Sequence, residues 1–250
     1  MTATPSLRAR ILDRRPLRGP FIAIPSPVAV ELTCGGEGAD FLCIDPEHSP
    51  ISDALLTDML RAAELCRTPA MVRTRSGQPR DIAAALDAGA AGILVPHVST
   101  PEAAARAVAA ARFPPEGSRG CGPGRAAGYL RDIAGHLDRA RRDTVVAIQL
   151  ETAEAVDNAD AILAVPGIDL AFIGPGDLGV DLAARRGDGA DLDAAIAGLL
   201  DAAAAAGVPA GIFTADRAAS ARWMEKLAFV IEGSDALWLT RAADAALAPL

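Results

Sequence analysis

The chain has 250 residues, of which 51% are hydrophobic and 22% charged, a composition typical of a globular protein with a large core. Its formal net charge of −8 argues against nucleic-acid binding, which needs clustered positive charge, so we expect no nucleic-acid partner. Lys226 is the only lysine, which leaves one candidate for Schiff-base chemistry, and no Gly-Lys-Ser/Thr forms a P-loop.

Cys34, Cys43, Cys66 and Cys121 form no CxxC pair, and they predict buried or partly buried free thiols in a reducing compartment. The N-terminal residues lack the apolar region of a signal peptide. No segment approaches the ~20 apolar residues that a membrane-spanning helix needs. We therefore expect a cytoplasmic protein that does not act at a membrane.

Short apolar segments of strand length alternate with helix-like segments along the chain. The predicted strands are residues 21–24, 41–45, 70–73, 92–96, 144–150, 170–174, 209–213 and 229–233. The predicted helices include residues 52–65, 79–88, 101–112, 153–163 and 192–206. Thr100 before Pro101 is a helix start signal, and Gly89 and Gly207 mark helix ends.

The predicted strands are apolar throughout, as strands buried on both faces of a parallel sheet are. Eight such strands with helical connections predict one α/β domain over residues 1–250, a (β/α)8 TIM barrel. A doubly wound open sheet is the alternative, but Pro25-Ser26-Pro27 does not resemble the glycine-rich turn that usually follows its first strand. Residues 113–128 form a long Pro/Gly-rich segment, either functional or an ordinary surface excursion.

In a barrel of this kind the chemistry lies at the carboxyl ends of the strands. Glu151 and Asp177 each follow an apolar strand there, and two carboxylates at one rim predict a site for Mg²⁺, Mn²⁺ or Co²⁺. The structural alternatives are a helix N-terminal carboxylate for Glu151 and a turn cap for Asp177.

His48 lies between carboxylates in Asp45-Pro46-Glu47-His48, and a neighbouring carboxylate suits an imidazole to act as a general base. Arg73 ends the third predicted strand, where a guanidinium can hold a carboxylate or a developing enolate oxygen. A structural histidine and a structural ion pair are the respective alternatives.

Four further side chains are weaker candidates. His97 lies at the same rim but could equally be a packing position, and His136 is expected on the surface of a helix. Arg75 and Arg119 are candidate secondary contacts for an anion.

Taken in order, four segments resemble the HpcH/HpaI-type metal-dependent class II pyruvate aldolases. They are residues 41–50 (FLCIDPEHSP), 71–104, 113–129 (FPPEGSRGCGPGRAAGY) and 145–182. The series D-x-E-H, R, Q-x-E and G-P-x-D-L at these spacings carries the resemblance, which extends over roughly residues 18–235.

The resemblance implies a TIM barrel, usually a hexamer in which C-terminal helices pack across subunits, and it implies roles for individual residues. It implies that Glu151 and Asp177 bind the metal, that Arg73 binds the pyruvyl oxygen, and that His48 is the base with Asp45 as its partner. It implies that Asp87 belongs to a His–Asp network near a subunit interface. It also implies that Gln149 contacts the substrate and that the Gly174-Pro175-Gly176 backbone binds the substrate carboxylate.

The implied activity is reversible cleavage of a 4-hydroxy-2-oxo acid to pyruvate, or a related 2-oxo acid, and an aldehyde, through an enolate that the cation and Arg73 stabilise. The alternatives are a citrate-lyase-β-like enzyme acting on an acyl-CoA and a non-catalytic metabolite-binding barrel. Departures from the family pattern include Pro46, and Cys121 and Phe213-Thr214 in the region expected for the aldehyde pocket.

Overall fold

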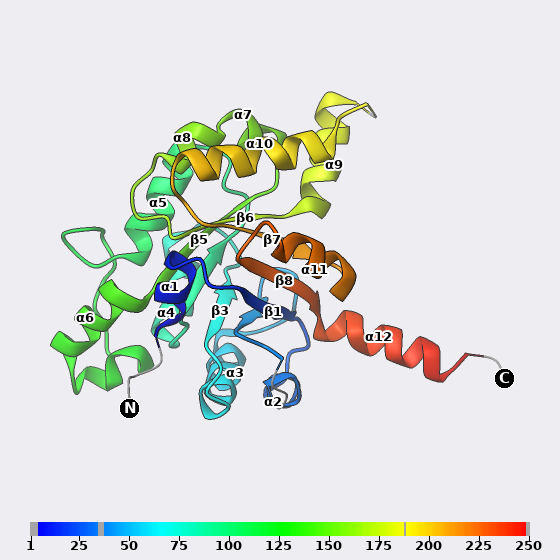
Figure 1. Ribbon diagram of the computed structural model, residues 1–250. Helices are drawn as coiled ribbons and strands as arrows, with labels where there is room; N and C mark the ends of the chain where they lie inside the picture. Colours follow the sequence, from blue (N-terminus) through cyan, green and yellow to red (C-terminus); the bar gives the residue numbers. More distant parts are fainter. Residues whose placement is uncertain (1–4, 35–37, 188, 249–250) are drawn as a thin grey trace.

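Eight parallel strands close into a barrel in chain order, β1 to β8, with β1 paired to β8 (Figure 1). The computed structural model describes residues 5–34, 38–187 and 189–248. The strands are β1 Leu17–Ile22, β2 Leu42–Ile44, β3 Ala70–Arg73, β4 Gly92–Val95, β5 Val145–Leu150, β6 Leu170–Ile173, β7 Ala210–Thr214 and β8 Phe229–Ser234. The fold is thus the predicted (β/α)8 barrel, and closure of the sheet excludes the open alternative.

Helices surround the barrel, and α1 covers one of its ends (Figure 1). They are α1 Leu7–Leu12, α2 Pro27–Cys34, α3 Asp53–Leu65, α4 Pro79–Asp87, α5 Pro101–Ala111, the 3-10 helix η1 Arg125–Leu130, α6 Ile133–Asp143, α7 Ala153–Asp157, α8 Ala159–Leu163, α9 Pro175–Arg186, α10 Leu192–Ala205, α11 Arg217–Met224 and α12 Asp235–Ala246. No helix of the described residues is long and apolar enough to cross a membrane.

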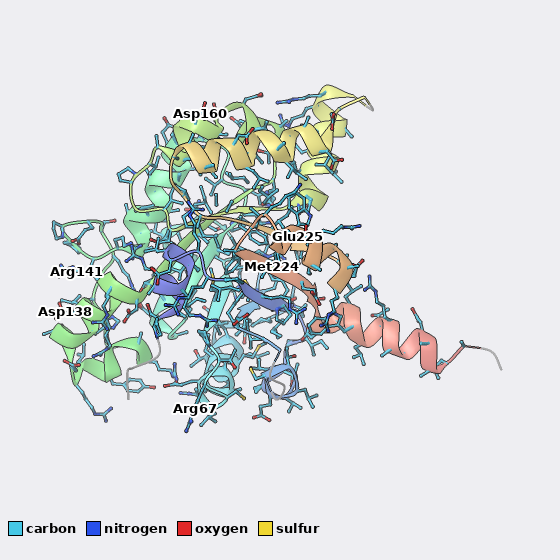
Figure 2. All side chains as sticks on the ribbon, in the orientation of Figure 1. Arg67, Asp138, Arg141, Asp160, Met224 and Glu225 are labelled. Atoms are coloured by element: carbon cyan, nitrogen blue, oxygen red, sulfur yellow. The ribbon has the colours of Figure 1, made fainter. Side chains whose placement is uncertain are left out.

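The core has two layers. Aromatic side chains fill the barrel interior, where Phe41 stacks on Phe229 with ring centroids 4.4 Å apart. Leu7 and Ile11 of α1 close the end of the barrel at which the strands begin. Between the strands and the outer helices lies a second, aliphatic layer. Charged side chains such as Arg67, Asp138, Arg141 and Asp160 are exposed on the outside of the ring (Figure 2). The rigid interior is what positions the strand ends.

Two predicted elements differ from the structure. The first strand begins four residues earlier than predicted, at Leu17, because Gly19 lets β1 approach β2 so closely that a Cβ would overlap the carbonyl oxygen of Phe41. The predicted helix 153–163 is interrupted at Asn158, whose backbone leaves the helical region and whose side-chain amide donates to the carbonyl of Ser99 at 2.9 Å.

The expected exposure of two residues was also wrong. His136 lies on α6 as predicted but is buried, because the Phe113 ring packs edge-on against its imidazole with centroids 5.4 Å apart. Cys121, expected to be at least partly buried, is exposed. All four cysteines are free, as predicted.

Candidate active site

The rim of the barrel that the carboxyl ends of the strands form carries a cluster of buried polar side chains. Alternate side chains of each strand point into the barrel, and the last inward position of a strand lies at this rim. The interior residues Cys43, Met71 and Ala147 are followed two positions later by the buried polar residues Asp45, Arg73 and Gln149. The strand period itself therefore brings these three polar residues to one rim.

Arg73 and Asp45 form a bidentate ion pair in the interior. Arg73 Nε and Nη2 donate to the two carboxylate oxygens of Asp45 at 2.8 and 2.6 Å, and the guanidinium lies 4.4 Å from the centroid of the Phe21 ring. Burial acts to lower the pKa of Arg73, but hydrogen bonds and charges from Asp45 and Glu47 outweigh it and raise the pKa. The guanidinium is a fixed positive charge at this rim.

Glu47 is a site residue that the sequence analysis treated only as a neighbour of His48. Its carboxylate is 8% exposed, Oε2 lies 3.2 Å from Arg73 Nε, and that oxygen accepts no hydrogen bond from the described residues. Burial, reinforced by the charge of Glu151, raises the pKa of Glu47 against the opposing effect of Arg73 and His48. The adjacent Asp45-x-Glu47-His48 motif was the signal that could have identified it.

Glu151 is buried at the end of β5 and does not cap a helix. Thr152 is the N-cap of α7, and Glu151 directly precedes it, beside the helix N-terminus as the structural alternative also expects. The Glu151 carboxylate instead accepts the backbone N–H of His97 at 2.7 Å on Oε1 and the Gln149 amide on Oε2. Gln149 Oε1 is left buried at the rim without a partner among the described residues.

Asp177 lies in the first turn of α9, three residues after Gly174, and it is exposed. Gly174, the N-cap, makes no side-chain capping bond, and the Asp177 carboxylate makes no hydrogen bond or ion pair within the described part of the chain. A Cβ on Gly174 would lie 2.8 Å from Glu151 Oε2, so this turn packs directly against that carboxylate. The turn cap proposed as an alternative for Asp177 is not formed.

The chemistry of these donors fits a hard divalent cation. Within the described residues, Glu151 is a buried carboxylate that pairs with no arginine or lysine, and Asp177 has no hydrogen-bond or ion-pair partner. Carboxylate oxygens are the ligands that Mg²⁺ and Mn²⁺ take. No three His, Cys, Asp or Glu of the described residues form a metal cluster.

Two histidines stand at the rim. The His48 side chain is 58% exposed, with Nε2 3.7 Å from Glu47 Oε2, and its backbone N–H points to Asp45 Oδ1 at 3.5 Å. Asp45 is therefore engaged by Arg73 rather than by the His48 ring. His97 lies closer to the carboxylates, with Nδ1 3.2 Å from Glu151 Oε1 and Nε2 3.3 Å from Glu47 Oε1.

Other candidates lie away from this cluster. Asp87 ends α4, at the end of the barrel where the strands begin, and pairs with Arg119 at 2.8 Å. Arg75 binds Asp53 on α3 at 2.8 Å. Lys226 lies three residues before β8, at the end opposite the rim, and so offers no amine to a Schiff base at this site.

A family model described as HpcH/HpaI aldolase/citrate lyase matches residues 20–239. The chain belongs to this family. It is 34% identical to a hydroxypyruvate/pyruvate aldolase of Paraburkholderia phytofirmans, over 98% of this chain and 97% of the relative. It is 34% identical to a 5-keto-4-deoxy-D-glucarate aldolase of Shigella boydii, covering 87% and 85%.

Among solved structures, an HpcH/HpaI aldolase/citrate lyase family protein from Burkholderia cenocepacia superposes with a TM-score of 0.88 at 36% identity, with 98% of each chain covered. Family membership and these relatives identify the protein as a lyase of the aldolase type.

Proposed function

We propose that the protein is a divalent-metal-dependent aldolase that cleaves a 4-hydroxy-2-oxo acid to pyruvate, or a related 2-oxo acid, and an aldehyde. The observation that carries the proposal is the rim cluster, which holds the buried guanidinium of Arg73 and the buried carboxylate of Glu151, with no arginine or lysine of the described residues paired to Glu151. Relatives named as pyruvate and sugar-acid aldolases support the same reaction class.

We assign to Arg73 the stabilisation of the enolate oxygen. Its Nε and Nη2 are held by Asp45, whereas Nη1 donates to none of the described residues and is available to a ligand. The ion pair with Asp45 fixes the direction of that donor before substrate binds, which is how preorganised charge lowers a barrier. Arg73 is thus a catalytic residue, and Asp45 positions it.

His48 is the residue we assign to proton transfer at the 4-hydroxyl or methyl carbon. Its exposed ring lies beyond hydrogen-bond distance of Glu47, so both ring nitrogens can face a substrate. An exposed imidazole whose ring nitrogens are open to a substrate suits a general base.

Glu151 and Asp177 are the residues that would hold Mg²⁺, Mn²⁺ or Co²⁺, and the bound cation would supply a Lewis acid for the 2-keto oxygen. Gln149 orients Glu151 through its amide and keeps its own oxygen for the substrate. The Gly174-Pro175-Gly176 segment opens α9. Gly174 N–H donates to the Leu150 carbonyl and Pro175 has no N–H, so the Gly176 N–H at the helix N-terminus is the donor of this segment that we assign to the substrate carboxylate.

The test is pyruvate release from a panel of 4-hydroxy-2-oxo acids, before and after exhaustive chelation and after re-addition of each metal. We expect activity that chelation abolishes and metal restores. Full turnover after chelation would refute the proposed metal dependence. Release from acyl-CoA substrates alone would favour the CoA lyase, and no turnover of any substrate would favour the non-catalytic barrel.

We also propose that copies of the chain form a homo-oligomer, of the hexameric kind that the resemblance implies, with α12 packing on a neighbouring copy. In the structure α12 extends away from the barrel (Figure 1), and Asp235 is its only buried residue. Trp238 and Leu239 are 38% and 60% exposed and border a groove of about 490 Å³ with Leu32 of α2. Sedimentation of Leu239→Glu should show smaller species than wild type.

Asp87 can join His48 only if another copy supplies it, because within one chain it lies at the opposite end of the barrel. Its side chain is 42% exposed, which leaves it open to such a neighbour. A cytoplasmic location is likewise a proposal, supported by the four free thiols.

A further inference from the structure

Two of the four cysteines lie at the ends of neighbouring helices. Cys34 is the last residue of α2, and Cys66 is the C-cap of α3. The two helices pack against each other on the outside of the barrel (Figure 1). A helix that follows a barrel strand runs back towards the end at which the strands begin, so both cysteines lie at that end, opposite the rim.

The side chains of these two cysteines are in contact. The Cys34 thiol lies within hydrogen-bonding reach of the Cys66 thiol and of the Thr68 side chain. The backbone at Cys66 is fixed by the end of α3, where Arg67 is left-handed with φ 58° and the N–H of Thr68 donates to the carbonyl of Ala63 at 3.0 Å. A disulfide forms without backbone movement only between side chains that already face each other. This pair meets that condition.

Cys34 and Cys66 also differ from the other two cysteines in their exposure. Both are half-buried, whereas Cys43 is buried among the apolar side chains of the barrel interior and Cys121 is exposed. A thiol must be accessible to react with an oxidant. The chain therefore contains one accessible pair in contact, one shielded thiol and one exposed thiol.

We propose that Cys34 and Cys66 form a reversible disulfide when the protein meets a hydroperoxide, and that this bond stabilises the fold by linking α2 to α3. In the first step the sulfur of Cys66 attacks the peroxide, the O–O bond breaks, and a sulfenic acid and an alcohol (water from hydrogen peroxide) are formed. In the second step the sulfur of Cys34 displaces the sulfenic oxygen, which leaves as water with the Cys34 proton. In total the two thiols lose two electrons and two protons to the peroxide.

The environment of Cys34 decides the order of these steps. Burial, reinforced by the neighbouring Cys66 thiol, raises the pKa of Cys34 to about 11 against the opposing hydrogen bond with Thr68. Cys34 is therefore protonated near neutral pH, and a protonated thiol is a poor nucleophile towards a peroxide. For this reason we assign the first attack to Cys66.

The experiment treats the reduced full-length protein with a small excess of hydrogen peroxide near neutral pH. Of the four thiols, we expect that two can no longer be titrated in denaturant, and that a dithiol reductant restores them. The intact mass should fall by about 2 Da, since two hydrogen atoms are lost. The bond closes a loop of the unfolded chain between residues 34 and 66, so the midpoint of thermal unfolding should rise by about 5–10 °C.

Single variants separate this bond from other oxidation. Cys34→Ser and Cys66→Ser, each shown to be folded by circular dichroism, should lose neither the 2 Da nor their original midpoint. Cys121→Ser, the matched control, should behave as wild type. Oxidation that stops at sulfinic acids, a link between chains through Cys121, or a mass loss that persists in Cys34→Ser would overturn the proposed disulfide. An oxidised protein that unfolds at no higher temperature than the reduced one would overturn its stabilising role.

Discussion

Arg73→Lys tests whether the bidentate ion pair at the rim organises the site. Lysine keeps the positive charge but is a single ammonium on a flexible chain, so it cannot reproduce the fork that donates to both oxygens of Asp45 at 2.8 and 2.6 Å. A hydrogen bond to a charged group contributes about 1.5–3 kcal/mol. The loss of one such bond inside the barrel should lower the free energy of unfolding by about 2–3 kcal/mol.

The same substitution removes the Nη1 donor that we assign to the enolate oxygen. Loss of one preorganised donor lowers kcat by about 10²–10³-fold. Urea unfolding followed by circular dichroism and a coupled assay of pyruvate release measure the two effects separately. Because the charge is retained, a loss of activity cannot be attributed to a missing positive charge.

Arg75→Lys is the matched control, since Arg75 lies two residues after Arg73 and also pairs with an aspartate, but at the exposed surface. Its ion pair should contribute less than about 1 kcal/mol. If Arg73→Lys changed stability and turnover no more than Arg75→Lys does, the preorganised arginine would play no part in the reaction and the reasoning would fail.

Three further outcomes are expected. Burial raises the pKa of Glu47 in the folded protein, so the folded protein loses stability as pH rises from the pKa of Glu47 in the unfolded chain through its pKa in the folded protein. Glu47→Gln removes this charge and should raise the urea midpoint of unfolding at neutral pH. The increase in stability should disappear in acid, where Glu47 is protonated in both states. Gly174→Ala should raise the metal concentration needed for half-maximal activity about tenfold or more, because its Cβ would press on Glu151, and an unchanged requirement would speak against a site there. Mixed oligomers of inactive Asp87→Asn and His48→Ala chains should regain activity; mixtures that stay inactive would exclude a site shared between copies.

Much of the site could be predicted from the sequence because strand periodicity and chain position determine which end of the barrel a residue occupies. Apolar segments of strand length placed Glu151 and Asp177 at the rim, and the structure confirms these positions. The first strand was predicted to begin at Phe21 because only residues 21–24 form a continuous apolar segment, whereas in the barrel it begins at Leu17 and Gly19 allows its close approach to the next strand.

The sequence by itself determined the barrel and the end of it at which the polar candidate residues lie. Only the tertiary structure decided the partners, because Glu47, His97 and Glu151 leave three different strands and meet across the barrel mouth. It also assigned Asp45 to Arg73 and placed Asp87 at the far end. Local patterns report which face and which end a side chain takes, but distances between side chains from different strands depend on barrel closure.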